Sequence, residues 1–252
     1  MLLENLTWPE VKKLKWNHVL VLLPLGSFEQ HGPHLPLTTD TDIVTAIARR
    51  IEEKRAERIL CLPTLWPGHS THHLFFPGTL SVSQMPYIQL VVELCHSIFN
   101  MGAQKVFLLN GHGGNDVPLR AALRELKTQF PKTKFVFASY WSLAGQTIKE
   151  VRESGPGGLG HACEMETSIM LHLHPARVKA RLGRKDGPKH TDIYRKSDMQ
   201  YARPVYFVNE FHEVTKTGTI GEPELATAEK GKRFLNGIVQ EVTKFVDEFA
   251  KW

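Results

Sequence analysis

Apolar runs and amphipathic stretches alternate along the first 140 residues. Residues 18–25 are almost wholly apolar, as expected of a strand buried on both faces of a parallel sheet. Residues 40–54 follow, with apolar side chains at the spacing of one helix face. The same alternation predicts strands at 58–62, 105–109 and 134–140 and helices at 85–100 and 117–128. This order predicts an α/β fold with three layers around a mostly parallel sheet.

The second half of the chain is less regular. We expect a helix to begin at His161 and a last helix to run from about Glu224 to Ala250, whereas the stretch from Pro175 to Thr217 is irregular and basic. No internal repeat, low-complexity tract or linker divides the 252 residues. We therefore expect one domain over residues 1–252.

Composition and charge narrow the function classes. With 42% hydrophobic and 23% charged residues, the chain has the balance of a globular protein that can bury a core. Its net charge is +5, but Lys and Arg are spread along the chain among acidic residues, which disfavours nucleic-acid binding. Thirteen histidines, several of them in Gly-rich loops, favour metal chemistry.

The cysteines and the hydrophobic runs indicate the compartment. Cys61, Cys95 and Cys163 are odd in number and lack CxxC spacing, which fits a reducing cytosol better than a disulfide framework. The N-terminus lacks the pattern of a signal peptide, and no run reaches the ~18 apolar residues of a membrane span. We expect a cytoplasmic protein. Cys163 could be proposed as a nucleophile, but a single cysteine near a histidine in sequence is weak evidence.

The stretch from residue 24 to 40 is the first candidate arm of a metal site. Glu29 and His31 are two apart, so on an extended chain both can reach one cation. Asp40 stands at the start of the next helix, where a carboxylate can ligate or bridge metals. Each has a plainer alternative: Asp40 as a helix N-cap, Glu29 as a solvated charge and His34 as a loop residue. Their combination after an apolar strand, where open α/β sheets place their sites, favours the metal site.

A second candidate arm follows the strand at 105–109. That strand runs directly into the segment Asn110-Gly-His-Gly-Gly-Asn115, which lacks both the GxGxxG and the GxxxxGK[ST] patterns of phosphate loops. His112 thus lies at the carboxyl end of a strand, between glycines that let the backbone pack close to it. We expect it to be another ligand. The long loop from Trp66 to Thr79 and Trp141 are expected to shape the pocket.

The third arm surrounds His161. On a helix, His161 and Glu164 are three apart and share a face, whereas Glu166 is rotated away. The alternative to metal binding for both glutamates is that their charges interact favourably with the positive end of the helix dipole.

This set of nitrogen and oxygen donors suits Zn, Mn or Fe, and a shared carboxylate suits two metals. Such a centre activates a bound water at neutral pH and polarises a carbonyl, so hydrolysis of a C–N bond is the natural chemistry. No Gly-x-Ser-x-Gly nucleophile turn competes with it.

Several motifs together resemble the creatininase (creatinine amidohydrolase) family, from about Glu4 to the last helix. They are Gly26-Ser-Phe-Glu-Gln-His-Gly-Pro-His-Leu-Pro, Asp40, Phe76-Pro-Gly-Thr, Asn110-Gly-His-Gly-Gly-Asn, Ser139-Tyr-Trp, and His161 with Glu166-Thr-Ser. The resemblance implies the three-layer creatininase-like fold, a homohexamer and a small-molecule amide as substrate.

The resemblance also implies roles for single residues. Glu29 and His112 would hold one metal and His31 the other, with Asp40 bridging. His161 would bind substrate and shuttle protons as the catalytic residue, and Ser70 would bind substrate.

Two departures from the family pattern bear on the substrate. Gly113 and Gly114 stand where creatininase proper has an aromatic residue and a further carboxylate ligand, and Gly157 with its glycine neighbours replaces a tryptophan before the active-site histidine. The Gly-His-Gly-Gly-Asn form resembles relatives acting on other amides, including formamide deformylases of flavin and deazaflavin biosynthesis and the peptidase of mycofactocin maturation. We expect Glu164 to replace the lost ligand because it shares a helix face with His161.

The expected function is thus a metal-dependent amidohydrolase with about two divalent metals per chain. The alternatives are a deformylase or peptidase on the same centre and, from another class, a metal-binding module without catalysis.

Overall fold

A four-stranded parallel sheet forms the centre of the computed structural model, which describes residues 1–252 except 189–193, 196–197 and 202–204. The strand order is β2-β1-β3-β4. The strands are β1 (Leu20–Leu25), β2 (Ile59–Cys61), β3 (Lys105–Asn110) and β4 (Lys134–Ser139). Every residue of β1 is buried, as its apolar run predicts.

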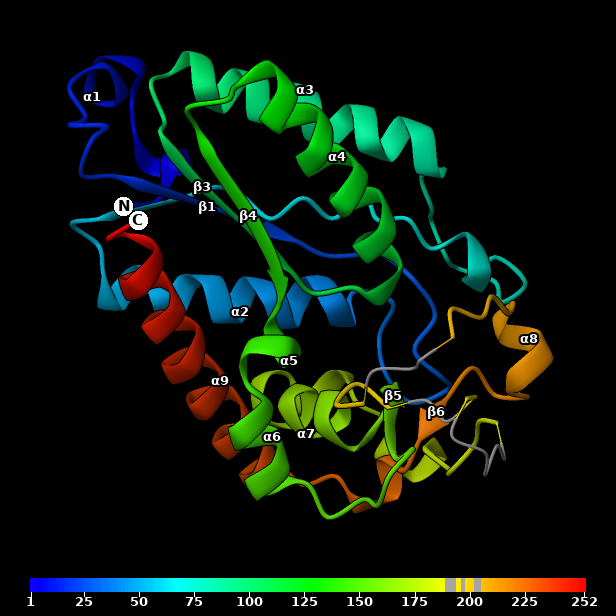
Figure 1. The fold of residues 1–252 in the computed structure, drawn as a ribbon. Helices are drawn as coiled ribbons and strands as arrows, with labels where there is room; N and C mark the ends of the chain where they lie inside the picture. The colour runs from blue at the N-terminus through cyan, green and yellow to red at the C-terminus, as the bar shows by residue number, and fades with distance from the viewer. Residues whose placement is uncertain (189–193, 196–197, 202–204) are drawn as a thin grey trace.

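Helices cover both faces of the sheet (Figure 1). One face packs against α3 (Gln84–Asn100) and α4 (Asp116–Gln129), and the other against α2 (Thr39–Lys54) and α9 (Ala228–Phe249). Alternate residues of β1 divide between the two apolar clusters, with Leu22 on the α2 side and Val21 on the α3 side. The prediction of three α/β layers with a mostly parallel sheet is confirmed.

Most of the remaining elements extend the layer that contains α2 and α9, whereas the N-terminal helix lies on the α3 side of the sheet (Figure 1). The short antiparallel pair β5 (Leu159–His161) and β6 (Ile220–Gly221) stands apart from the main sheet. The other helices are α1 (Trp8–Lys12), α5 (Tyr140–Leu143), α6 (Gly145–Val151), α7 (Glu164–Leu173) and α8 (Phe211–Val214). Part of the stretch expected to be irregular, 175–217, lies outside the described residues.

The helix expected to begin at His161 starts three residues later. His161 ends β5, Ala162 turns the chain with a φ of 50°, and Cys163 caps α7, which begins at Glu164. A positive φ is uncommon for alanine, and it breaks the helical path that the residue spacing indicated. The last helix likewise begins later than expected, at Ala228, after a 3-10 turn and a cap by Thr227.

Helices α7 and α9 pack closely because α9 carries Gly231 at the contact. A Cβ at this position would lie 1.8 Å from the carbonyl oxygen of Ser168, which belongs to the backbone of α7 and cannot rotate away. This contact matters for the site because α7 follows directly after His161.

We expect Gly231→Ala to separate the two helices. Overpacking of this kind costs about 3 kcal/mol in the free energy of unfolding, which corresponds to a Tm lower by roughly 6–12 °C in a chain of this size. Differential scanning calorimetry measures it. Asn236→Ala, on the exposed side of the same helix, is the control and should change stability by less than about 0.5 kcal/mol. Equal melting temperatures for the two variants would contradict the role of Gly231.

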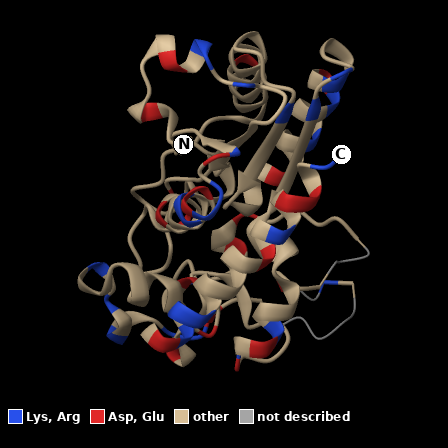
Figure 2. Ribbon diagram, turned by 90° about the vertical axis from the view of Figure 1, so that its left-hand side faces the viewer, with Lys and Arg blue, Asp and Glu red and all other residues tan. Residues whose placement is uncertain are grey.

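Basic and acidic side chains are interspersed along the ribbon in the view of Figure 2. None of the described helices combines the length and apolar character needed to cross a lipid bilayer.

Candidate metal centre

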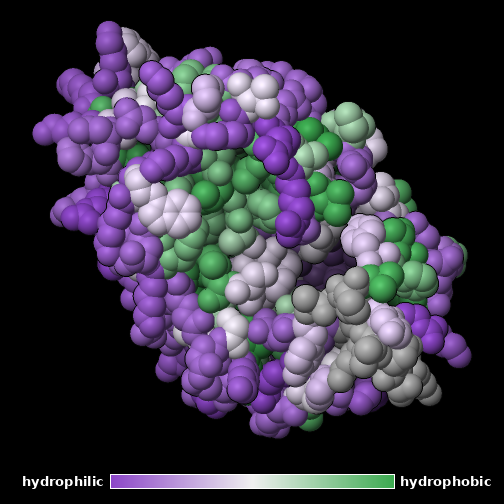
Figure 3. All heavy atoms as spheres, viewed as in Figure 1, coloured by the Kyte–Doolittle hydropathy of each residue, from purple (hydrophilic) through white to green (hydrophobic). Residues whose placement is uncertain are grey.

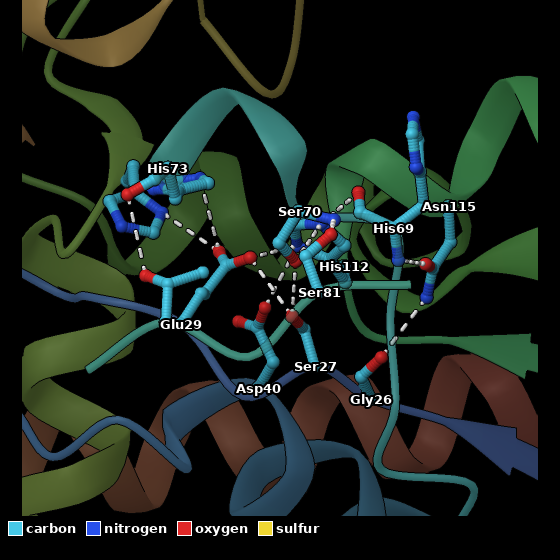
Figure 4. Close-up of polar contacts among 12 residues, drawn as sticks. Gly26, Ser27, Glu29, Asp40, His69, Ser70, His73, Ser81, His112 and Asn115 are labelled. Carbon is cyan, nitrogen blue, oxygen red and sulfur yellow. Dashed lines mark hydrogen bonds and ion pairs between the residues drawn. The ribbon is translucent and has the colours of Figure 1, made fainter. Parts of the chain in front are cut away.

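Five ionisable side chains meet at the carboxyl ends of β1 and β3. Glu29 and His31 come from the segment after β1, Asp40 from the first turn of α2, and His112 from the residues after β3. Glu166 approaches from the first turn of α7. All five are at most 4% exposed. The order of the parallel strands therefore brings together the first two arms, from which Figure 4 labels Glu29, Asp40 and His112, and α7 adds the third.

Two groups of these side chains can each hold one cation. In the first, Nδ1 of His112 lies 3.1 Å from Oε2 of Glu29 and 3.0 Å from Oδ2 of Asp40. In the second, Nε2 of His31 lies 3.0 Å from Oδ1 of Asp40, and Glu166 is the third member. Asp40 takes part in both groups with different oxygens. Its position is therefore that of a bridging carboxylate.

Backbone carbonyls hold three imidazoles with one nitrogen directed into the cluster. The outer nitrogens of His31, His112 and His161 lie 3.1, 3.1 and 2.7 Å from the carbonyl oxygens of Glu29, His69 and Gln30. Since a carbonyl only accepts, each outer nitrogen carries a proton, so in the neutral imidazole the inner nitrogen holds the lone pair that a metal would use. This arrangement is typical of histidines that ligate metals.

The donor set fits a divalent metal. Oδ2 of Asp40 and Oε1 of Glu29 are buried and accept no hydrogen bond from the described part of the chain. Uncompensated buried carboxylates cost several kcal/mol, and a cation held by these two carboxylates would offset that cost. Burial also raises the pKa of Glu166 to about 7, despite the opposing charge of His31. A bound cation would favour the ionised carboxylate.

The histidines differ in their electrostatics. Burial lowers the pKa of His31, but the adjacent Asp40 more than compensates and raises it to about 9. His161 lies farther from a carboxylate, 3.6 Å from Oε1 of Glu29, and burial together with the neighbouring His31 lowers its pKa well below the usual range. This shift favours the neutral form of His161.

Comparison with known proteins gives the family. The family model described as creatinine amidohydrolase matches residues 4–246. The chain belongs to the creatininase family. It is 32% identical over 240 residues to the mycofactocin precursor peptide peptidase of Mycobacterium tuberculosis, an alignment that covers 92% of this chain and 85% of the relative. It is 29% identical over 264 residues to the creatinine amidohydrolase of Pseudomonas putida, covering 97% and 95% of the two chains.

The solved structures of creatininases share the fold. A mutant creatininase of the Zn-Zn type superposes with a TM-score of 0.80 at 27% identity, over 98% of this chain and 97% of that one. The family expected from the motifs is thus confirmed, and the named relatives are hydrolases.

Within this creatininase-family site, Glu164 does not lie where the sequence led us to expect a ligand. Its carboxylate is 2.8 Å from Nζ of Lys230 and accepts the backbone N–H groups of Glu153 and Ser154. The potential metal groups among the described residues are the two above and a third of Glu29, His31 and His161. Glu164 belongs to none of them, whereas Glu166 belongs to one. The turn at Ala162 is the reason, because the helix face shared by His161 and Glu164 does not exist.

Ser70 and Trp141, the expected substrate-binding residues, take different positions. The buried Oγ of Ser70 lies 2.5 Å from Oγ of Ser27 and 3.1 Å from Nε2 of His112 (Figure 4). Ser70 is thus in direct contact with the cluster. Trp141 lies on α5, packs against Tyr140 and the apolar cluster, and accepts a hydrogen bond from Gln200 at its carbonyl.

Three contributors to the site carried no assigned role in the sequence analysis. Ser27 donates to Oε2 of Glu29 at 2.9 Å, and Gln30 and His73 contact each other and the histidine cluster. Gln30 sits between the two expected ligands of the first arm, and His73 lies in the long loop noted for its histidines. Their positions in those two segments were the only indication in the sequence that they contribute to the site. Cys163, by contrast, is fully buried, and burial raises its thiol pKa well above the usual range, so it is not an activated nucleophile.

Proposed function

We propose that this chain is a metal-dependent amidohydrolase that cleaves a C–N bond of a small cyclic or linear amide with a metal-activated water. The observation that carries the proposal is the buried convergence of two candidate metal groups on one shared carboxylate, Asp40. Glu29 and His112 would hold one divalent metal, His31 and Glu166 the other, and Asp40 both. When bound, such metals polarise the carbonyl and lower the pKa of water.

The protein's own groups would manage the protons. His161 donates its Nε2–H to the carbonyl of Gln30, so Nδ1 holds the lone pair and lies 3.6 Å from Oε1 of Glu29. Nδ1 can take a proton from the nucleophile and return it to the departing nitrogen. Ser70 lies beside His112 and would hydrogen-bond the substrate. We also propose that Trp141 helps to form the substrate pocket.

A peptidase or deformylase on the same centre is the second candidate. Exposed apolar side chains adjoin the cluster: Phe75 is 67% exposed and stacks on His212, next to Phe211, whose ring packs on His73. An apolar margin favours a substrate larger than creatinine, such as a peptide. A hydrolysis screen of lactams, formamides and short peptides distinguishes the candidates. Salt-dependent nucleic-acid binding without any hydrolysis would favour a non-catalytic module instead.

We expect about two metals, Zn, Mn or Fe, per chain by elemental analysis of protein purified without a metal-binding tag. Removing them with a chelator should lower the Tm by roughly 10 °C, because a ligand present at about 1,000 times its Kd stabilises the folded state by about 4 kcal/mol. Adding Zn or Mn should restore the Tm, whereas adding Ca should not, because histidine nitrogens suit Zn and Mn better than Ca. An unchanged Tm after complete metal removal would argue against the centre.

The proposals on domain organisation, compartment and oligomeric state are supported by the family and by the edge strand of the sheet. We propose that residues 1–252 act as one domain, that the protein works in the cytoplasm, where its three buried cysteines stay reduced, and that it forms a homo-oligomer, a hexamer by resemblance. Apolar surface gathers over β4, an edge strand whose central residues are only half-buried (Figure 3). Light scattering of the purified protein measures the oligomeric state.

A further inference from the structure

His73 adjoins the metal centre without belonging to either group of ligands. It ends the 3-10 turn Thr71–His73, is 1% exposed, and brings Nε2 within 3.3 Å of Oε1 of Glu29 (Figure 4). The potential metal groups among the described residues do not include it. The hydrogen bonds around it determine what it can do there.

The side-chain amide of Gln30 has one possible orientation. Its Oε1 accepts the backbone N–H of Gly32 at 2.9 Å, and its Nε2 donates to the carbonyl of Gly218 at 3.1 Å. A backbone N–H can only donate and a carbonyl can only accept, so exchanging the two ends of the amide would break both bonds.

This orientation determines the tautomer of His73. The second N–H of Gln30 Nε2 faces Nδ1 of His73 at 2.8 Å. Nε2 of His161 lies 3.2 Å from the same amide nitrogen, but it carries the proton that it donates to the carbonyl of Gln30 and cannot accept. Because an amide nitrogen only donates, Nδ1 must hold a lone pair, and the imidazole proton lies on Nε2. His73 is thus the reverse of His31, His112 and His161: its proton faces the cluster, whereas in their neutral forms the proton faces a backbone carbonyl on the outer side.

The group facing this N–H is a carboxylate oxygen without a hydrogen bond. Oε2 of Glu29 already accepts from Ser27 and faces His112, whereas Oε1 has no hydrogen bond of normal geometry from the described residues. His73 Nε2 faces Oε1 at 3.3 Å without ideal alignment, and His161 Nδ1, which holds a lone pair, lies 3.6 Å from it. On its other side the ring of His73 packs against Phe211, with 3.8 Å between the centroids. The phenyl ring fixes the plane of the imidazole and shields it from water.

We propose that His73, held by Gln30 as the Nε2–H tautomer, is a positioning residue that donates to Oε1 of Glu29 and so directs Oε2 toward the metal shared with His112 and Asp40. The inference rests on the proposed metal binding by Glu29. Partners of this kind, which orient a ligating carboxylate, typically change metal affinity by about 10–100-fold.

Metal titration of three variants tests this role. We expect His73→Leu to raise the Kd of one of the two zinc ions by about 10–100-fold, measured against a chromophoric chelator, while the other ion stays bound as in the wild type. His73→Gln carries an amide that can donate in place of Nε2–H and should recover most of the affinity. Thr71→Ala, in the same 3-10 turn, is the control and should bind both ions normally, because Thr71 is not a member of any potential metal group among the described residues.

The tautomer is measured independently on the unmodified, zinc-loaded protein by ¹⁵N NMR of the histidine side chains. The expected spectrum has a protonated Nε2 and an unprotonated Nδ1 at His73, opposite to the pattern of a histidine whose Nε2 ligates zinc. An unprotonated Nε2, or unchanged affinity for both ions in His73→Leu, overturns the inference about His73 alone. A wild-type protein that binds no zinc overturns both this inference and the proposed centre.

Discussion

Replacing Asp40 by alanine is expected to remove both metals and to lower kcat/KM by more than about 10³-fold. Its two oxygens lie 3.0 Å from His31 and 3.0 Å from His112, so one substitution takes a donor from each candidate group. The remaining donors would then be too few to hold either cation firmly. Removing a single hydrogen-bond donor to a developing oxyanion typically lowers kcat by about 10²–10³-fold. Removing a metal that polarises the carbonyl should lower it further.

Asp42→Ala is the matched control for this experiment. Asp42 lies in the same first turn of α2 but is partly exposed, and it pairs with Arg177 at 2.8 Å on the surface. Such pairs contribute less than about 1 kcal/mol, so metal content and turnover should stay near those of the wild type. Elemental analysis and steady-state kinetics on both variants give the answer. Undiminished hydrolysis by Asp40→Ala would refute the metal-activated mechanism.

The sheet and the first two arms of the site could be predicted from sequence because their signals are local. The buried run that became β1 and the amphipathic period that became α2 specify both elements, and parallel strands bring their carboxyl ends to one edge. Glu29, Asp40 and His112 meet there for that reason. The topology turned three separate sequence motifs into one cluster.

The third arm could not be predicted because it depends on one backbone angle. The positive φ at Ala162 ends the path of β5 and delays α7, so residue spacing counted from His161 selects the wrong face. His73 was missed for a related reason. Its loop has no periodicity, and its hydrogen-bonding role appears only once Gly218, far along the chain, fixes the amide of Gln30.

The two glutamates at the start of α7 should therefore respond to substitution in opposite ways. Glu166 is grouped with His31 and Asp40, so we expect Glu166→Gln to lose one metal of two and at least about 10²-fold in kcat/KM while the fold is kept. Glutamine preserves the shape and one oxygen, but it removes the charge that a divalent cation requires. Elemental analysis beside kinetics measures both effects.

Glu164→Gln should instead keep both metals and lose stability. Glu164 is fully buried, and its carboxylate pairs with Nζ of Lys230, whose side chain is 8% exposed. Among the described residues, Lys230 would keep only the largely exposed Glu153, at 3.0 Å, as a carboxylate partner. Removing one partner of a buried ion pair costs about 3 kcal/mol. Calorimetry should therefore show a Tm lower by roughly 6–12 °C for Glu164→Gln. If Glu164→Gln lost a metal and Glu166→Gln did not, Glu164 would be the ligand after all and α7 would begin differently in the metal-bound protein.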